Sequence, residues 1–330
     1  MTPVDHEPSR RQRTVGLLAV VGAILCFAMS FGIIKWPGVP GSVIASWRLV
    51  GSALVWWTLL VSLRFTNGRP LPSRHVWKVT LPAALLFGIY ISVFFTAVTK
   101  TSVAHAEFIN SLAPLLVIPA GFVLFKERPN WSALRFGALS LIGLVVVLFT
   151  GPEQGAATVE GDLLMIIVVV ATVSYLMASK FARGRGVATA DFMAIVMPVA
   201  LVTAAPVALI VAGGELWPLS WQAWVAVVIL SFLTGGAAHG LLFFAHRTVP
   251  IATISVMQVS QPALSAFWAW VIVDEAITVT QIPGMLLVIV GMALVVWFSQ
   301  QGVPPEPLAN DRGADESSAP ATGSSSPAGR

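Results

Sequence analysis

The chain has 330 residues, of which 56% are hydrophobic and 10% charged, and its formal net charge is +4. Its mean hydropathy of +0.84 means that it carries more apolar surface than a water-soluble domain of this length could bury. Its basic residues are scattered over short segments between apolar runs and form no single stripe, so nucleic acid is not an expected partner. We therefore expect an integral membrane protein surrounded by the lipid bilayer.

Ten apolar runs are long enough to cross a hydrocarbon core, which takes about 20 helical residues. They are predicted at 15–34, 42–63, 76–98, 103–124, 132–150, 162–181, 190–211, 221–245, 250–273 and 280–299. The first run is long and nine more follow it, so we expect a permanent span there and not a cleaved signal. Residues 1–14 and 300–330 are expected to be tails, and the second tail is expected to be disordered because Pro, Ser, Ala and Gly dominate it.

Lys and Arg concentrate on one side of these spans. The segments before span one and between spans two and three, four and five, and six and seven hold basic residues. The opposite segments 151–161, 212–220 and 274–281 hold none. Because positive residues are retained on the cytoplasmic side of short loops, both termini are expected to be cytoplasmic.

One offset of 148 residues relates the two halves of the chain. It pairs Gly88 with Gly236, Phe95 with Phe243, Ala97 with Ala245, Ala104 with Ala252, Pro114 with Pro262, Glu127 with Glu275, Gly143 with Gly291 and Val147 with Val295. A constant offset of this kind is typical of an internal repeat. Residues 15–150 and 162–299 then form two five-span halves, and because five is odd, the second half enters the membrane from the opposite side. The predicted fold class is an all-α integral membrane protein with ten transmembrane helices in two inverted five-helix repeats.

The stretches "FFTAVTKTSVAHAEFINSLAPLLVIPAGFVLFKE" and "LFFAHRTVPIATISVMQVSQPALSAFWAWVIVDE" resemble the EamA repeat of the drug/metabolite transporter superfamily. Arg48, in "IASWRLVGSAL" of span two, stands where such proteins often carry an arginine. The resemblance implies a carrier of small organic molecules, often an exporter, in the inner (plasma) membrane of a bacterium. It also implies a central cavity lined mainly by the first, third and fourth spans and their repeat partners.

Each half places an amide side chain four residues before a proline. A proline inside a helix leaves the carbonyl four residues earlier without its donor, so kinks predicted at Pro114 and Pro262 expose acceptors beside Asn110 and Gln258. Unmatched polar groups in hydrocarbon must face protein or a water-filled cavity. Both amides are therefore candidates for binding a solute, and the alternative is that they bond neighbouring helices.

Glu107 lies one turn before Asn110, and a carboxylate inside a span is costly unless it has a function. It is a candidate for binding a substrate amine or for carrying a coupling proton, a task that His239 of span eight would share. The alternative is a shallow, hydrated acid near the start of span four, beside His105.

Deep aromatic residues are candidates for the apolar walls of a solute cavity. They are Tyr90, Phe94, Phe95, Tyr175, Trp268 and Trp270. Trp268 and Trp270 lie on different faces of one helix, so at least one of them is expected to meet lipid or a neighbouring helix.

Five further residues are assigned structural duties. Glu127 and Glu275, at the ends of spans four and nine, are expected to cap the following helix or to pair with a basic neighbour. Arg48 must snorkel, face the cavity or pair with an acid, and we favour pairing. Gly143 and Gly291 are expected to permit close helix packing.

The sequence has no Gly-rich phosphate loop, no zinc-protease motif and no acidic ligand cluster. We therefore expect no enzymatic activity, no cofactor and no metal. The expected function is secondary transport of small organic metabolites, without ATP, by alternating access around a cavity between the repeats. The alternatives are an integral-membrane enzyme that uses His105, Glu107 and His239, and a passive channel. The sequence sets neither the substrate nor the oligomeric state.

Overall fold

The computed structural model describes residues 10–125, 135–150, 157–214, 216–217, 220–245, 257–258 and 260–300. In this part of the chain the secondary structure is entirely helical. The helices of the first half are α1 (Arg10–Lys35), α2 (Gly41–Asn67), α3 (Arg74–Lys100), α4 (Val103–Asn110), α5 (Ala113–Phe125) and α6 (Gly137–Phe149). Those of the second half are α7 (Val159–Arg183), α8 (Thr189–Val211), α9 (Trp221–Phe232), the π-helical η2 (Leu233–Ala238), α10 (His239–Ala245), α12 (Gln261–Val273), the short 3-10 turn η3 (Val279–Gln281) and α13 (Ile282–Gln300).

The lengths and composition of these helices fit a bilayer. Within the described residues, seven helices are long and apolar enough to cross a membrane, and three shorter apolar helices cover 137–149, 261–273 and 279–295. Each of the ten predicted spans coincides with one of them. Large apolar side chains such as Leu18, Leu54 and Val202 are about two-thirds exposed, as expected where lipid replaces water. The predicted class, a ten-helix membrane protein, is confirmed.

Side-chain caps fix where four of the helices begin. Ser73, Ser102, Thr158 and Ser220 each accept a hydrogen bond from the backbone N–H three residues later, at the starts of α3, α4, α7 and α9. Each cap satisfies an N–H group that has no partner within its helix, which stabilises a helix by about 1 kcal/mol. The local sequence therefore sets these boundaries.

The offset of 148 residues reappears in the helix bounds. α1 ends at Lys35 and α7 at Arg183, and α2 begins at Gly41 and α8 at Thr189. α5 and α12 have 13 residues each, and both of their ends are related by the same offset. The repeat is thus a repeat of structure as well as of sequence.

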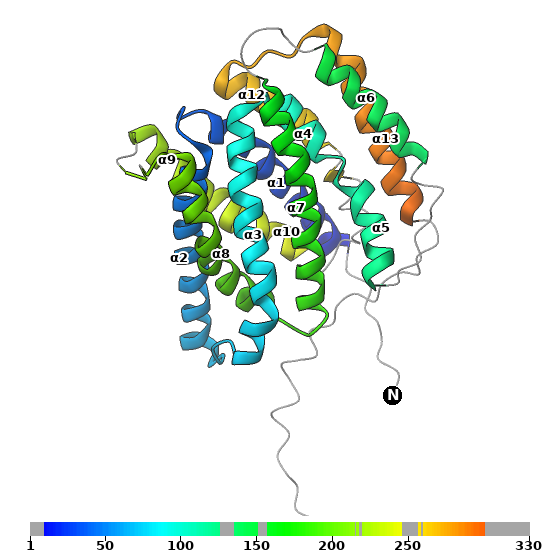
Figure 1. Ribbon diagram of the computed structural model, residues 1–330. Helices are drawn as coiled ribbons and strands as arrows, with labels where there is room; N and C mark the ends of the chain where they lie inside the picture. The colour runs from blue at the N-terminus through cyan, green and yellow to red at the C-terminus, as the bar shows by residue number, and fades with distance from the viewer. Residues whose placement is uncertain are drawn as a thin grey trace, which may run out of the picture.

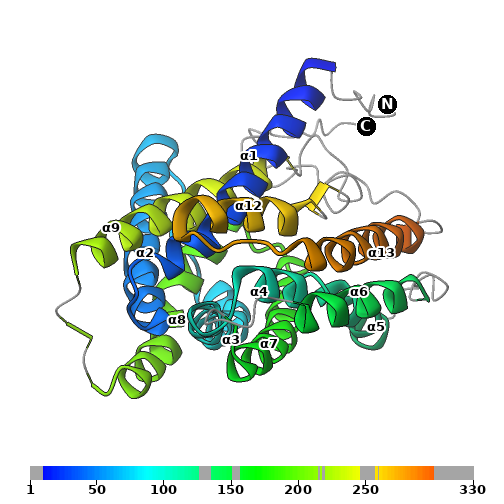
Figure 2. The ribbon, with the colours of Figure 1, turned by 90° about the horizontal axis from the view of Figure 1, so that it is seen from above.

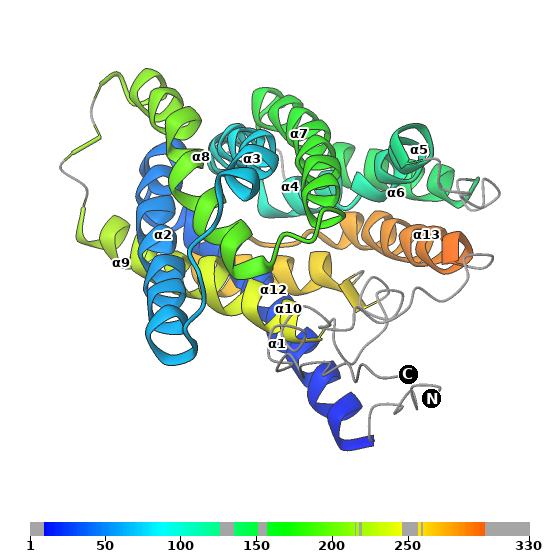
Figure 3. The same ribbon diagram turned by 90° about the horizontal axis from the view of Figure 1, so that it is seen from below.

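The packing of the helices follows the same symmetry (Figure 1). α2 packs on its repeat partner α8, and α6 packs on its partner α13. The contact of α5 with α7 has its counterpart in α1 with α12, and the contact of α3 with α7 has its counterpart in α1 with α9, η2 and α10. In the views from above and below, α6 and α13 lie side by side at one edge of the molecule, and α2, α8 and α9 lie at the other (Figures 2 and 3).

Close approach at glycines holds α6 against α13. A Cβ atom on Gly143 would lie 2.6 Å from the Gly284 carbonyl oxygen and 2.7 Å from the Val288 nitrogen. A Cβ atom on Gly291 would meet the Phe136 oxygen at 3.1 Å and the Ser140 nitrogen at 2.8 Å, the equivalent atoms of the other half. Because the two backbones touch here, neither position has room for a side chain.

The structure differs from the predicted proline kinks. Span four is interrupted at Ser111 and Leu112, between α4 and α5, so it is broken and not bent. Pro114 and Pro262 are each the second residue of the new helix, α5 or α12. Proline is tolerated there because the first turn of a helix needs no N–H donor. Each proline therefore starts a half-helix instead of distorting a continuous one.

Candidate functional site

Glu107 is the most buried acid of the described spans and lies where the two halves meet. It is 2% exposed and sits in the short helix α4, which packs on α12 and α7. Its Oε1 atom accepts hydrogen bonds from Gln261 Nε2 at 2.9 Å and from Ser265 Oγ at 2.8 Å. Its Oε2 atom is buried and has no partner in the described part of the chain. The shallow, hydrated position that the sequence left open is not what this structure shows.

The sequence pattern pointed to Gln258 and not to Gln261 and Ser265, the two residues that bond Glu107. Gln261 and Ser265 are four residues apart and therefore project from one face of α12. This i, i+4 pair of polar residues in an apolar helix was the available signal, and it lies directly beside Pro262. Gln258 is half-buried in the helical residues 257–258, just before α12.

Asn110 ends α4, one turn after Glu107. The residue is half-buried, and its Oδ1 atom is buried without a hydrogen-bond partner among the described residues. Two acceptor oxygens, Glu107 Oε2 and Asn110 Oδ1, are therefore left unmatched close to the break between α4 and α5. A buried acceptor without a donor is unfavourable by about 1–3 kcal/mol, so a donor from a ligand would be favoured here.

Arg48 occupies α2 and is also 2% exposed. Its Nε atom donates to Thr234 Oγ1 at 3.0 Å, and its guanidinium lies 5.6 Å from the centroid of the Phe95 ring. Its Nη1 atom is buried without a partner, and none of the salt bridges among the described residues includes it. The acid that we expected to pair with Arg48 is thus absent from the described part of the chain.

The π-helical segment η2 holds this arginine in place. Thr234 Oγ1 also donates to the Leu230 carbonyl at 2.9 Å, and Trp56 Nε1 donates to the Gly235 carbonyl at 2.7 Å. His239 directs Nδ1 to the Thr234 carbonyl, and because a carbonyl can only accept, Nδ1 carries the proton. Single π-helical turns occur frequently at functional sites.

Phe95, the ring beside Arg48, contacts Phe94, which belongs to a wider aromatic group. The rings of Tyr90 and Tyr175 are stacked, with centroids 6.1 Å apart and planes inclined by 6°. Phe87 contacts Tyr175, and Phe94 contacts Tyr90, at centroid distances of 4.9 and 5.9 Å. Trp270 does not belong to this group, because it is 56% exposed and touches Phe267.

A group of polar contacts, called the closure below, joins the ends of several helices one turn from Glu107. Glu275 accepts from Lys35 Nζ at 2.7 Å and from the Val103 backbone N–H at 2.5 Å, and Lys35 Nζ also donates to the Thr101 carbonyl at 2.8 Å. Lys35, at the end of α1, thus contacts both the α3–α4 connection and Glu275. Glu275, which directly follows α12, in turn contacts the start of α4. Val103 is four residues before Glu107, about 6 Å along the helix.

Asp162 extends the closure to α7. Its carboxylate accepts from Thr101 Oγ1 at 2.5 Å and contacts His105 Nδ1 at 3.0 Å. Glu275 was expected to pair with a basic residue, and it does so with Lys35, which belongs to the other half of the chain. Glu127, its repeat partner, lies outside the described residues.

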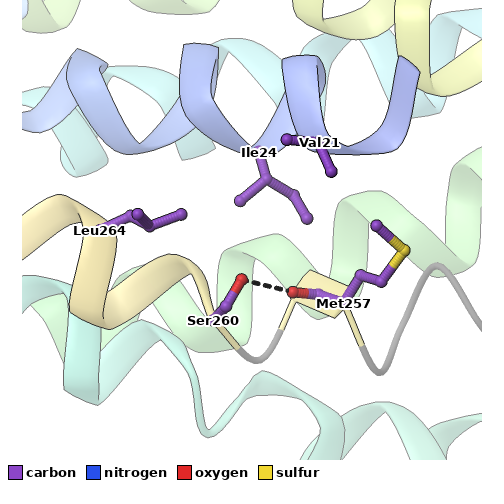
Figure 4. A pocket seen from close by; sticks show the side chains of 5 residues that line it. All are labelled: Val21, Ile24, Met257, Ser260 and Leu264. Carbon is purple, nitrogen blue, oxygen red and sulfur yellow. Dashed lines mark hydrogen bonds between the residues drawn. The ribbon is translucent and has the colours of Figure 1, made fainter. Parts of the chain in front are cut away.

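A cavity of about 310 Å³ lies between α1 and α12. It is lined by Val21, Ile24, Met257, Ser260 and Leu264, with the α1 side chains facing those of the second half (Figure 4). Ser260 and Leu264 directly precede the two residues that bond Glu107. Val21 and Ile24 are 14 and 11 residues before Lys35 on α1, so the cavity and the closure lie at different depths.

The chain is similar to known transporter proteins. The profile of the EamA-like transporter family matches residues 14–149 and again 159–297. The chain is 26% identical over 102 residues to a Bacillus subtilis (strain 168) protein named "Uncharacterized transporter YcxC", a match that covers 30% of this chain and about a third, 33%, of that relative. A solved structure described as "Crystal structure of protein" has the same fold, with a TM-score of 0.57, 21% identity and coverage of 88% of this chain and 98% of that chain. The resemblance to the EamA repeat is therefore confirmed.

Proposed function

We propose that this chain, which belongs to the EamA-like transporter family, is a secondary carrier that exports small organic metabolites by alternating access. The observation that carries the proposal is the position of Glu107. A buried, incompletely bonded carboxylate lies between a polar closure and a cavity, at the point where broken helices of the two halves meet. Inverted-repeat carriers bind their solutes at such places, because discontinuous helices offer polar groups near the membrane midplane.

The proposed setting is the inner (plasma) membrane, with both termini on the cytoplasmic side and repeats at 15–150 and 162–299. In this orientation the closure between Lys35 and Glu275 faces outward, and the cavity at Val21 and Ile24 lies toward the cytoplasm. The structure then represents the state that is closed to the outside. Export requires the closure to open while the opposite end closes, which exchanges the conformations of the two halves.

Glu107 is proposed to contact the solute or to carry a coupling proton, since both tasks need a carboxylate that can change partners. The test uses the full-length protein in liposomes loaded with amino acids, purine bases and choline, with efflux followed by mass spectrometry. Glu107→Gln keeps the size of the side chain and its acceptor oxygen but removes the charge. We expect it to lower the efflux of the transported solute by about ten- to a hundredfold, the equivalent of one charged hydrogen bond.

Glu160→Gln is the matched control, because Glu160 is two-thirds exposed and paired only with Lys100 on the surface. It should leave efflux unchanged. Solute on the far side should accelerate efflux, since a carrier exchanges solutes whereas a channel does not. Efflux that neither saturates nor responds to external solute would indicate a channel, and conversion of a solute to a product would indicate an enzyme.

A further inference from the structure

α3 and α7 lie side by side, run in opposite directions and form one edge of the molecule in the views from above and below (Figures 2 and 3). At the closure end, Thr158 Oγ1 before α7 donates to the carbonyl of Lys100, the last residue of α3, at 2.7 Å. Near mid-length the rings of Phe87 and Tyr175 are in contact, with centroids 4.9 Å apart. These two contacts determine which residues of α3 and α7 lie at the same depth.

This register brings aromatic, apolar and basic side chains together at the end opposite the closure. Trp77 and Arg185 are each ten residues from the ring contact, counted along their own helices, and therefore lie at about the same depth. Leu81 and Phe181 are each six residues from it and also lie level. Trp77, Leu81 and Phe181 are 36%, 43% and 47% exposed, and Arg185 is exposed as well. All four residues thus meet the bilayer.

Three cations of this region have no acidic neighbour to neutralise them. Arg74, Lys78 and Arg185 are exposed, and none of the salt bridges among the described residues includes them. Between residues 60 and 82 and between residues 170 and 192 the sequence has one acid, Asp191. Asp191 is already paired with Arg69 at 3.1 Å. The three cations are therefore suited to an anion from outside the chain.

The depth of these cations matches the headgroup region of a bilayer. Lys78 is 22 residues before Lys100, a separation of about 33 Å along the helix, and the hydrocarbon core is about 30 Å thick. Lys78 therefore lies near the phosphate groups, whereas Leu81 and Phe181 lie one turn deeper, among the acyl chains. The Arg185 guanidinium packs on the Phe181 ring, 3.3 Å from its centroid, which connects the two layers.

We propose that this surface of α3 and α7 binds an anionic glycerophospholipid of the surrounding bilayer. The surface, called the basic surface below, comprises Arg74, Trp77, Lys78, Leu81, Phe181 and Arg185. The lipid phosphate accepts hydrogen bonds from the three cations, and an acyl chain lies against Leu81 and Phe181. A free phosphate would leave the apolar layer without a partner, and a zwitterionic lipid has no net charge for the cations to attract. Each cation near a membrane surface strengthens such binding about fivefold.

The test measures lipid binding to the purified full-length protein by native mass spectrometry. The protein is titrated in detergent with dioleoyl phosphatidylglycerol and, separately, with dioleoyl phosphatidylcholine, which has the same acyl chains. We expect the anionic lipid to bind at least about tenfold more tightly, the effect of between one and two cations. Equal binding of the two lipids would overturn the proposal. Displacement of the anionic lipid by equimolar glycerol phosphate would also overturn it, because the site would then recognise the phosphate alone.

Variants locate the binding on the basic surface. Lys78→Gln should weaken phosphatidylglycerol binding about fivefold, and the triple variant Arg74→Gln, Lys78→Gln, Arg185→Gln about a hundredfold. Phosphatidylcholine binding should not change. The three side chains are exposed, so each variant should fold, and thermal unfolding in detergent checks that it does.

Arg64→Gln is the matched control for Lys78→Gln. Arg64 is also exposed and lies in the last turn of α2, outside the α3–α7 pair, and the change in net charge is the same. It should leave phosphatidylglycerol binding at the wild-type value. Equal losses in Arg64→Gln and Lys78→Gln would show that net charge attracts the lipid, and undiminished binding in the triple variant would place the lipid elsewhere. Either result would overturn the assignment to α3 and α7, and the carrier proposal does not depend on it.

Discussion

Two regions of the molecule differ in how far they obey the repeat. They are the α6–α13 pair and the polar centre, which comprises Arg48, Glu107 and the residues that contact them. In the pair, Gly143 and Gly291 approach equivalent backbone atoms of the other half, so both copies do the same work. In the centre, four polar or aromatic residues have apolar counterparts 148 residues away: Arg48 has Val196, Tyr90 has Ala238, Gln261 has Ala113 and Ser265 has Val117. Asn110, by contrast, has the amide Gln258 as its counterpart. The packing contact thus occurs in both halves, whereas these four side chains occur in one half only.

The largest expected effect tests the symmetric part of this comparison. Gly143→Ala and Gly291→Ala each place a Cβ atom within about 3 Å of backbone atoms, so α6 and α13 must separate. Overpacking costs typically 1–3 kcal/mol, and we expect about 3 kcal/mol for each variant because backbone cannot turn aside. Thermal unfolding in detergent micelles measures the loss.

Gly240→Ala is the control for both glycine variants, since a Cβ atom there meets nothing within 4 Å. Alanine is also the better helix former, so this variant should match or exceed the wild-type melting temperature. If only one of Gly143→Ala and Gly291→Ala destabilises the protein, the two halves do not share this interface equally.

A smaller effect tests the asymmetric part. Ser265→Val installs the residue of the counterpart position and removes one of the two donors to Glu107 Oε1. We expect a loss of about 1–2 kcal/mol in stability, because a buried carboxylate loses a hydrogen bond, together with slower efflux. The reverse exchange, Val117→Ser, should leave efflux unchanged, since Val117 lies at the corresponding site of the half without the carboxylate. Equal losses of efflux in both variants would contradict the single-site interpretation.

The sequence alone was sufficient for the fold, because its signals are local or periodic. Ten apolar runs and one constant offset are read directly along the chain, and the helices follow them closely. The central site was only partly predictable. Glu107 was identified because a charge inside an apolar span is conspicuous, but its partners Gln261 and Ser265 depend on which face of α12 meets α4, which no single span reveals.

The placement of Arg48 shows the same limit more strongly. Its depth in span two made pairing with an acid the natural expectation, since a buried cation normally has one. Its observed partners, Thr234 and Phe95, come from η2 and α3, and a π-helical turn has no clear signature in one sequence. Trp270, predicted as a wall candidate, is 56% exposed. The sequence did not reveal this, because the lipid-facing side of an apolar helix resembles its buried side in composition.

The smallest expected effect concerns the closure, whose pairs lie near the surface. Glu275→Gln removes the charge that Lys35 and the Val103 N–H share, and it should make the outward-open state more frequent. The reporter is Val103→Cys in a Cys26→Ser background, which contains no other cysteine. Because Val103 is fully buried behind the closure, a membrane-impermeant maleimide added outside should label Cys at this position about tenfold faster, the equivalent of 1.4 kcal/mol.

Lys100→Gln is the matched control, because Lys100 pairs with Glu160 at the same end of the molecule but on the exposed surface. Exposed ion pairs contribute little to conformational equilibria, so the labelling rate should stay at the wild-type value. If both variants accelerate labelling equally, loss of any charge at this end loosens the fold, and Glu275 has no special part in it. If neither variant accelerates labelling, apolar packing between α1 and α12 keeps Val103 inaccessible, and the ion pair does not contribute. The expected difference between the two variants therefore isolates the contribution of Glu275, which joins the second half to Lys35 and Val103 of the first.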